Sequence, residues 1–182
     1  MSYKKKHPET CLAKSLLILV NKEKKIIYDK NKELDIFLFS LKYDRENISR
    51  GHIEKTAKDF GINIDWYVGT KIFFDFVKKR SIPSKTRLFL SKVNLKLIDL
   101  LLKKPIIIYL DQFYLWNKKD GLYYKYHYPH FIVVLGKIGD DYKIIDPNNG
   151  RVKFVNGKIL SKAIISLRNH LFFSPQVIQI KS

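Results

Sequence analysis

The chain has 182 residues, which is enough for one domain with a hydrophobic core. Its 46% hydrophobic and 14% aromatic residues argue against a disordered chain, and no apolar stretch reaches the roughly 18–20 residues of a membrane span. A single cysteine excludes an internal disulfide and favours a reducing, cytoplasmic compartment. The net charge of +18 is scattered in short lysine runs, so we expect a solvated basic surface, with nucleic-acid binding as the less favoured alternative.

The first half of the chain, about residues 1–104, is predicted to be mainly helical. A helix over roughly residues 9–20 is apolar nearly all round, which predicts that it is buried in the middle of the domain. Residues 34–39 fit a short helix and a strand equally well. The rest of this half is predicted as helices over residues 49–60, 72–79 and 94–104 and one alternating strand over residues 62–68.

The second half, about residues 105–182, is predicted to be a sheet. Its expected strands cover residues 105–111, 130–137, 142–146, 151–155 and 175–180, with a turn at Asn156–Gly157 and one helix over residues 159–167. Helices first and antiparallel strands second predict an α+β fold, with N-terminal helices packed on a C-terminal antiparallel sheet. We expect a single domain over residues 1–182.

Cys11, at the start of the first predicted helix, is the candidate nucleophile. The thiolate is the reactive form of cysteine, and both a helix N-terminus and a neighbouring imidazolium favour it. Thr10 is the N-cap if the helix starts at Cys11, whereas a start at Pro8 would place Cys11 one turn further in. The structural alternative is a small buried thiol in an apolar helix.

His130 and Asp146 are the candidate partners of this thiol. His130 opens an apolar strand, and Asp146 ends the next strand just before the turn sequence Pro147–Gly150. The two residues lie on adjacent strands of a predicted hairpin, so the carboxylate can reach one imidazole nitrogen while the other nitrogen faces the thiol. The structural alternatives are a strand-edge histidine bonded to the backbone and a turn-forming aspartate.

Several segments resemble the papain-like family thirty-nine cysteine peptidases, which include the domains that cut double-glycine leaders from bacteriocin precursors. The resemblance is carried by Cys11 at its helix start and by the segments Lys104–Tyr109, His130–Gly136 and Tyr142–Gly150. It implies a papain-like fold in which Cys11 is the nucleophile, His130 the general base and Asp146 the residue that orients the base. It also implies a peptide substrate cleaved through an acyl-thioester intermediate, and no cofactor.

A second set of residues is similar to the butirosin biosynthesis protein H N-terminal family. Asp111–Leu115, Tyr124, His127 and His130 carry this similarity. It implies a thiol acyltransferase that moves an acyl group from the thioester of a carrier protein to an amine, and the net charge of +18 favours an acidic carrier. One cysteine and five scattered histidines lack the paired spacing of a zinc site, so we expect no metal.

The chain departs from the papain-like pattern around the nucleophile. Residues 1–10 contain no glutamine that could supply an oxyanion-hole amide, and Leu12 follows Cys11 where a glycine is usual. Losing one oxyanion donor costs roughly 10²–10³ in rate, so a catalytically inactive basic binding module stays an alternative. The candidates for substrate-binding or oxyanion roles are Thr10, Gln112, Trp116 and His127.

Overall fold

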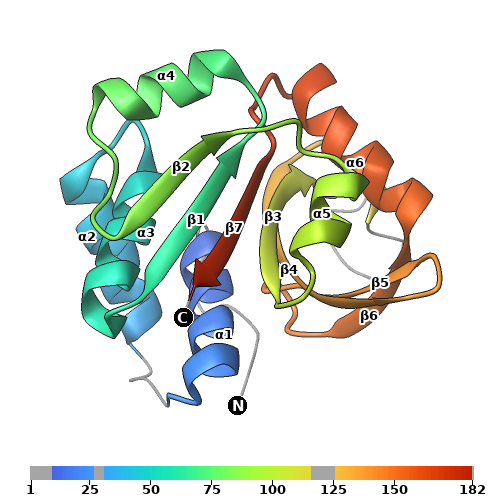
Figure 1. Ribbon diagram of the computed structural model, residues 1–182, viewed down its shortest axis with the longest axis horizontal. Helices are drawn as coiled ribbons and strands as arrows, with labels where there is room; N and C mark the ends of the chain where they lie inside the picture. The colour runs from blue at the N-terminus through green and yellow to red at the C-terminus, as the bar shows by residue number, and fades with distance from the viewer. Residues whose placement is uncertain (1–9, 27–30, 116–125, 182) are drawn as a thin grey trace.

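One mixed sheet of seven strands organises the part of the chain that the structure describes (Figure 1). The computed structural model describes residues 10–26, 31–115 and 126–181. In these residues the helices are α1 (Cys11–Lys24), α2 (Lys32–Tyr43), α3 (Ile48–Phe60), α4 (Lys71–Lys79), α5 (Leu95–Leu101), the short 3₁₀ helix η1 (Gln112–Tyr114) and α6 (Gly157–Asn169). The strands are β1 (Asn63–Val68), β2 (Thr86–Leu90), β3 (Ile106–Asp111), β4 (Pro129–Ile138), β5 (Asp141–Ile145), β6 (Val152–Asn156) and β7 (Gln176–Lys181).

Both halves of the chain contribute to this sheet, whose strand order is β2-β1-β7-β3-β4-β5-β6. The last strand, β7, lies antiparallel between β1 and β3 and so joins the first half of the chain to the second. Strands β1 and β2 pair in parallel. The α+β class is therefore observed, and the strands of the second half, β3 to β7, pair only antiparallel with one another. The expectation that the sheet belongs to the second half alone is wrong, because β1 and β2 of the first half extend it and their parallel pairing makes it mixed.

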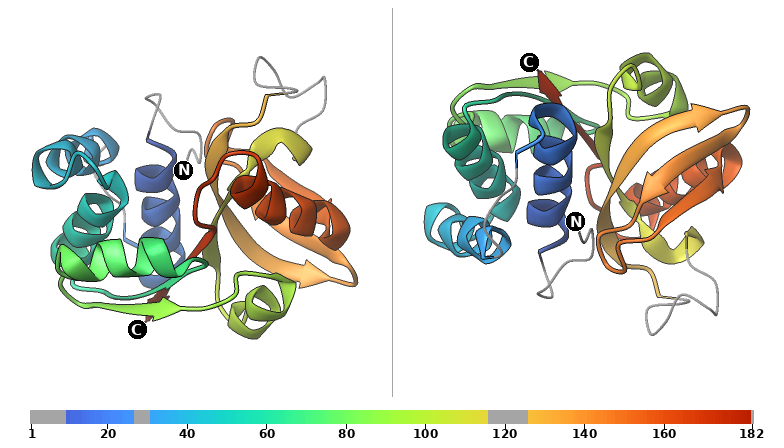
Figure 2. Two further views of the ribbon diagram at one scale, coloured as in Figure 1. Left: turned by 90° about the horizontal axis from the view of Figure 1, so that it is seen from above. Right: turned by 90° about the horizontal axis from the view of Figure 1, so that it is seen from below.

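Helices cover both faces of the sheet where β3 and β4 run side by side. Figure 2 shows α1 and α6 on opposite sides of these strands. Ile107 belongs to the core that contains α1, whereas Ile106 and Ile108 belong to the core that contains α5 and α6. Burial on both faces explains why β3 is an unbroken apolar run, since each buried aliphatic side chain contributes about 1.5–3 kcal/mol. The same argument applies to α1, whose residues Leu12–Val20 are all buried.

Local signals place most of the remaining elements. The ambiguous segment 34–39 lies inside α2, and Gly61 ends α3 in a left-handed conformation with φ of 60°. The expected turn at Asn156–Gly157 is instead the start of α6, because the Asn156 side chain accepts a hydrogen bond from the Lys158 N–H at 3.0 Å and caps the helix. No helix among the described residues combines the length and the apolar character needed to cross a membrane.

Gly51 marks the close crossing of α2 and α3, and we expect Gly51→Ala to destabilise the fold by about 1–3 kcal/mol. A Cβ at this position would lie 2.4 Å from the Ser40 Cα, so the two helix backbones would have to separate. An unhindered glycine-to-alanine change in a helix stabilises by up to about 1 kcal/mol, so the sign of the effect is diagnostic. Urea denaturation measures it. Gly136→Ala is the control, because a Cβ there meets nothing within 4 Å; equal stability of the two variants would contradict the tight crossing.

Candidate active site

Cys11 is the first residue of α1, and its thiol is partly exposed at the end of a buried helix. Thr10 is the N-cap residue, and its carbonyl accepts the Lys14 N–H at 2.9 Å. The helix therefore starts at Cys11 and not at Pro8, which places Cys11 in the first turn. At this position the partial positive charge of the helix N-terminus acts on the sulfur and favours the thiolate.

His130 and Asp146 meet at the ends of two neighbouring strands. His130 is the second residue of β4, opposite Leu110 of β3, and Asp146 directly follows β5. The side chains are 1% and 0% exposed, and His130 Nε2 lies 2.9 Å from Asp146 Oδ1. The turn after β5 holds the carboxylate in place, because the Asn148 N–H donates to the same oxygen at 2.8 Å and the Gly150 N–H donates to the Asp146 carbonyl at 2.7 Å.

The imidazole of His130 also contacts the Cys11 thiol, so the three side chains form one chain of interactions. Burial alone would lower the pKa of His130, but the charge and the hydrogen bond of Asp146 outweigh it, and a hydrogen bond with Cys11 adds to them. Together they raise the pKa of His130 from 6.5 to about 9. Because Nε2 is engaged by Asp146, Nδ1 is the ring nitrogen left for the thiol. An imidazolium held beside a sulfur favours the thiolate form.

Gln112 lies close to the start of β4, in the 3₁₀ helix that follows β3. Its N–H donates to the Tyr128 carbonyl at 3.0 Å, two residues before His130. The side chain is 1% exposed, and its Nε2 has no hydrogen-bond partner among the described residues. A buried amide donor without a partner is unusual in a folded protein, and it leaves Gln112 able to donate to a bound oxygen.

The side chain of Thr10, a candidate for a substrate-binding or oxyanion role, is buried against α2. Its hydroxyl donates to Oε1 of Glu33, the second residue of α2, and both side chains are buried. The hydroxyl is therefore directed into the protein, and the Thr10 side chain makes no capping hydrogen bond to the first turn of α1. Trp116 lies outside the described residues. The sequence gives no signal that Glu33 is buried, because this residue follows Lys32 just before the ambiguous segment 34–39.

His127 lies in a second cluster, built around Asp111, rather than between Cys11 and Asp146. Its Nδ1 is 2.5 Å from Asp111 Oδ2. Its ring stacks between the rings of Phe113 and His170, whose centroids lie 4.2 Å and 4.6 Å from its own. The same Asp111 oxygen accepts from the Ser166 hydroxyl at 2.6 Å. Asp111 also accepts the Phe113 and Tyr128 N–H groups, so this cluster fixes both the end of β3 and the segment that leads into β4. Its members come from distant segments, so spacing along the chain could not reveal it.

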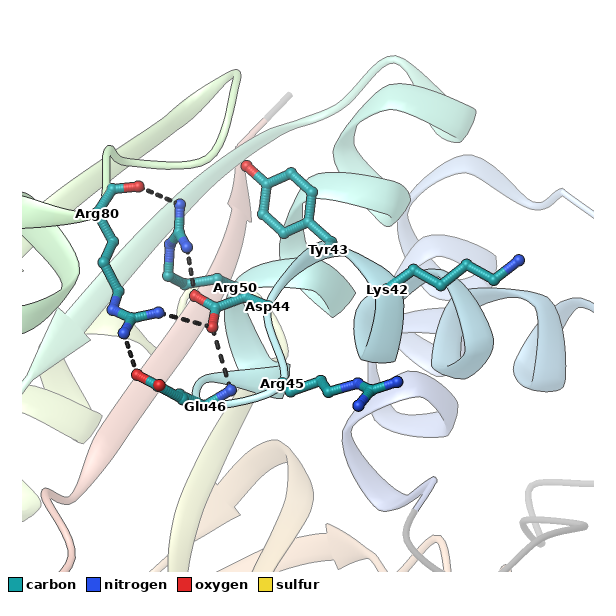
Figure 3. A pocket seen from close by; sticks show the side chains of 7 residues that line it. All are labelled: Lys42, Tyr43, Asp44, Arg45, Glu46, Arg50 and Arg80. Carbon is teal, nitrogen blue, oxygen red and sulfur yellow. Dashed lines mark hydrogen bonds and ion pairs between the residues drawn. The ribbon is translucent and has the colours of Figure 1, made fainter.

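Another polar group of side chains lines a hollow of about 410 Å³ at the corner between α2 and α3 (Figure 3). Asp44 lies there between Arg50 and Arg80, while Lys42 and Arg45 point away from it. Cys11, His130 and Asp146 do not line this hollow. In the described part of the chain, no group of three or more histidine, cysteine, aspartate or glutamate side chains is arranged to hold a metal ion.

The sequence was compared with protein-family models and with curated proteins. No protein-family model matches the sequence, and the comparison with curated proteins found no match.

Proposed function

We propose that the protein is a papain-like thiol enzyme that forms an acyl-thioester on Cys11 and releases it to water, as a cysteine peptidase or amidase does. The observation that carries this proposal is the His130 imidazole, which contacts the Cys11 thiol and is held by the buried Asp146 carboxylate. A helix start, a strand start and a strand end supply the three groups, and each is the setting that its role requires.

In the proposed reaction the same three side chains act twice, first when the acyl-thioester forms and then when water hydrolyses it. The Cys11 thiolate attacks the carbonyl carbon of an amide or thioester, and the His130 imidazolium donates its proton to the leaving nitrogen or sulfur. The neutral imidazole then takes a proton from water as the water attacks the acyl-thioester, and the thiolate leaves. Asp146 holds the imidazole in one orientation and stabilises its protonated form.

The proposed oxyanion hole lacks the usual upstream glutamine. The Cys11 N–H at the helix start is one donor of the proposed hole. Gln112 is the proposed second donor, because its buried Nε2 is without a partner in the described residues and its main chain pairs with Tyr128 beside the start of β4. The +18 charge favours acidic peptides or an acidic carrier protein as partners.

Alkylation of Cys11 by iodoacetamide tests the proposal. The neighbouring imidazolium favours the thiolate, so we expect the midpoint of the alkylation rate to lie well below the pH of about 8.5 at which an ordinary thiol ionises. In His130→Ala the midpoint is expected to rise to about 8.5 and the rate at pH 6 to fall at least about tenfold, in line with one pKa unit or more of lost thiolate stabilisation. Mass spectrometry quantifies the label on the single cysteine.

His170→Ala is the control for this measurement, because that histidine stacks on His127 and belongs to the second cluster. We expect its alkylation profile to match that of the unchanged protein. A wild-type midpoint near that of a free thiol, unchanged by His130→Ala, would contradict the enzyme and favour the binding module.

Acyl transfer to an amine is the second candidate function. The structure joins Asp111 and His127, two residues that carry the similarity to the acyltransferase family, in one cluster just before His130. The two reactions share their first half and differ only in what collects the acyl group. Incubation with a carrier-bound thioester, with and without an amine, distinguishes them, because hydrolysis releases the acid and transfer releases the amide, both resolved by mass spectrometry.

A further inference from the structure

We propose that the hydrogen bond between Thr10 and Glu33 positions the nucleophile, with Thr10 and Glu33 acting as positioning residues for Cys11. This inference rests on the proposed function, because it concerns how the same thiol reaches the same imidazole. It adds a second anchor, from α2, to a site otherwise built from α1, β4 and β5.

Glu33 is the buried group that needs an explanation. It is 3% exposed, and a carboxyl group is rarely buried unless it is paired or hydrogen-bonded. Its position in the first turn of α2 makes burial easier, since acidic side chains are favoured at a helix N-terminus. Its Oε1 accepts the Thr10 hydroxyl, which is fully buried.

Thr10 uses its side chain in an unusual way. A threonine at the N-cap commonly accepts a hydrogen bond from an N–H in the first turn and so stabilises its own helix. Here the Thr10 side chain makes no such bond and reaches instead to a residue 23 positions away in the chain. The hydroxyl therefore links two helices instead of capping one.

This link fixes the residue next to the nucleophile from two directions. The Thr10 carbonyl accepts the Lys14 N–H, which ties its main chain to α1, and its hydroxyl ties its side chain to α2. Helix α2 is itself held against α3 at the close Gly51–Ser40 crossing. Cys11 follows Thr10 directly, so the position of α2 sets where the thiol lies relative to His130.

The test compares variants that break the link with variants that keep it. Thr10→Val and Glu33→Ala each remove one partner, whereas Thr10→Ser keeps the hydroxyl and Glu33→Gln keeps an acceptor oxygen without the charge. In the first two, we expect the iodoacetamide rate of Cys11 at pH 6 to fall roughly 10–100-fold, because a thiol displaced from the imidazolium loses thiolate stabilisation and each pKa unit lost lowers the thiolate fraction about tenfold. We also expect the alkylation midpoint to move upward. The two conservative variants are expected to retain the wild-type profile.

Ser84→Ala is the matched control for a purely structural role. Ser84 also donates its hydroxyl to a buried carboxyl group, that of Glu54, at 3.0 Å, and Glu54 is likewise 3% exposed. The control is expected to lose stability in thermal unfolding while the Cys11 midpoint stays unchanged. Rates are compared below each variant's unfolding transition, which removes the contribution of unfolded chains.

The outcomes separate this inference from the function on which it rests. A Thr10→Val profile that matches that of Ser84→Ala, in a protein whose wild-type Cys11 depends on His130, would overturn the positioning role alone. A wild-type Cys11 that reacts as an ordinary thiol would overturn the proposed function first. A double variant, Thr10→Val with Glu33→Ala, is expected to be no worse than either single variant, because both remove the same bond; full additivity would also contradict the link.

Discussion

Asp146→Ala is expected to reduce turnover by about 10³–10⁴-fold, as the loss of a triad carboxylate does in other enzymes. The reason is visible in the pairing of His130, whose Nε2 is held by Asp146 Oδ1 at 2.9 Å. Without that acceptor the ring loses its fixed orientation and the charge that stabilises its protonated form. The measurement is the rate of acyl-thioester cleavage or, before a substrate is known, the rate of Cys11 alkylation at pH 6, which we expect to fall in the same direction.

The same change is expected to alter how stability depends on pH. The pKa of His130 is raised from 6.5 to about 9, so the folded state holds this proton more tightly than the unfolded state does. The stabilisation is therefore complete below about pH 6.5 and is lost as the pH rises through about 9. In Asp146→Ala this alkaline loss should become much smaller, which denaturation between pH 6 and pH 10 measures.

His52 provides an internal control, because it makes the stability of the fold depend on pH in the acid range. It is fully buried, and burial lowers its pKa from 6.5 to about 4, against the opposing hydrogen bond to the Ile48 carbonyl. The unfolded state binds this proton more readily, so stability falls as the pH falls from about 6.5 to about 4. Asp146→Ala should leave that acid loss unchanged. An alkaline loss that persists in the variant would show that His130 does not depend on Asp146.

The sequence alone predicted the elements that depend on local pattern. The unbroken apolar runs of α1 and β3 are buried as expected, and Gly61 ends α3 as expected. The positions of Cys11, His130 and Asp146 at the ends of such elements were predictable for the same reason. That the three side chains interact is a consequence of tertiary folding, and only the structure could display it.

Elements that depend on distant partners were the ones missed. Strand β2 has no clean alternation and lies at the edge of the sheet, where β1 is its one partner among the described strands. Its Arg87 is joined to the buried Asp65 of β1 by two hydrogen bonds of 2.8 and 2.9 Å, a stabilising contact invisible in the local sequence. The Trp66 Nε1–H likewise donates to Gln176 at 2.9 Å, across 110 positions of the chain.

Buried polar contacts around the candidate site were missed for the same physical reason. Glu33 and Ser166 are ordinary helix residues in the sequence, and each acquires its partner only when two helices or a helix and a strand come together. His127 was a candidate for a substrate-binding or oxyanion role. Its bond to Asp111 holds it near the end of α6, where it stacks on His170.

Asp44→Ala is expected to cause the largest loss of stability, about 3–5 kcal/mol, because it leaves a buried guanidinium without its counter-charge. The Asp44 and Arg50 side chains are 3% and 6% exposed and form a direct ion pair. Arg80 also donates to Asp44, at 3.1 Å (Figure 3). Urea denaturation at pH 7 gives the free energy of unfolding.

The main-chain contacts of the two partners explain why this pair cannot relax easily. Asp44 accepts the N–H groups of Glu46 and Asn47, and so also shapes the turn between α2 and α3. Arg50 donates to the carbonyls of Arg80 and Ser81 beyond the end of α4. Removing the carboxylate therefore loosens the turn and leaves the Arg50 charge fixed in the interior.

The stability of the fold at acid pH supplies a second readout for the Asp44–Arg50 pair. Burial acts to raise the pKa of Asp44, but the hydrogen bonds from Arg50 and from the Asn47 N–H outweigh it, and the pKa lies below its ordinary value. Its contribution is therefore present above the unfolded-state pKa and is lost as the pH falls through the lower folded-state value. Asp75→Ala is the control, because its pair with Lys71 is exposed on both sides and should change stability by about 0.5 kcal/mol or less. A loss in Asp44→Ala as small as in that control would mean that the guanidinium of Arg50 finds other partners or water at the corner of α2 and α3.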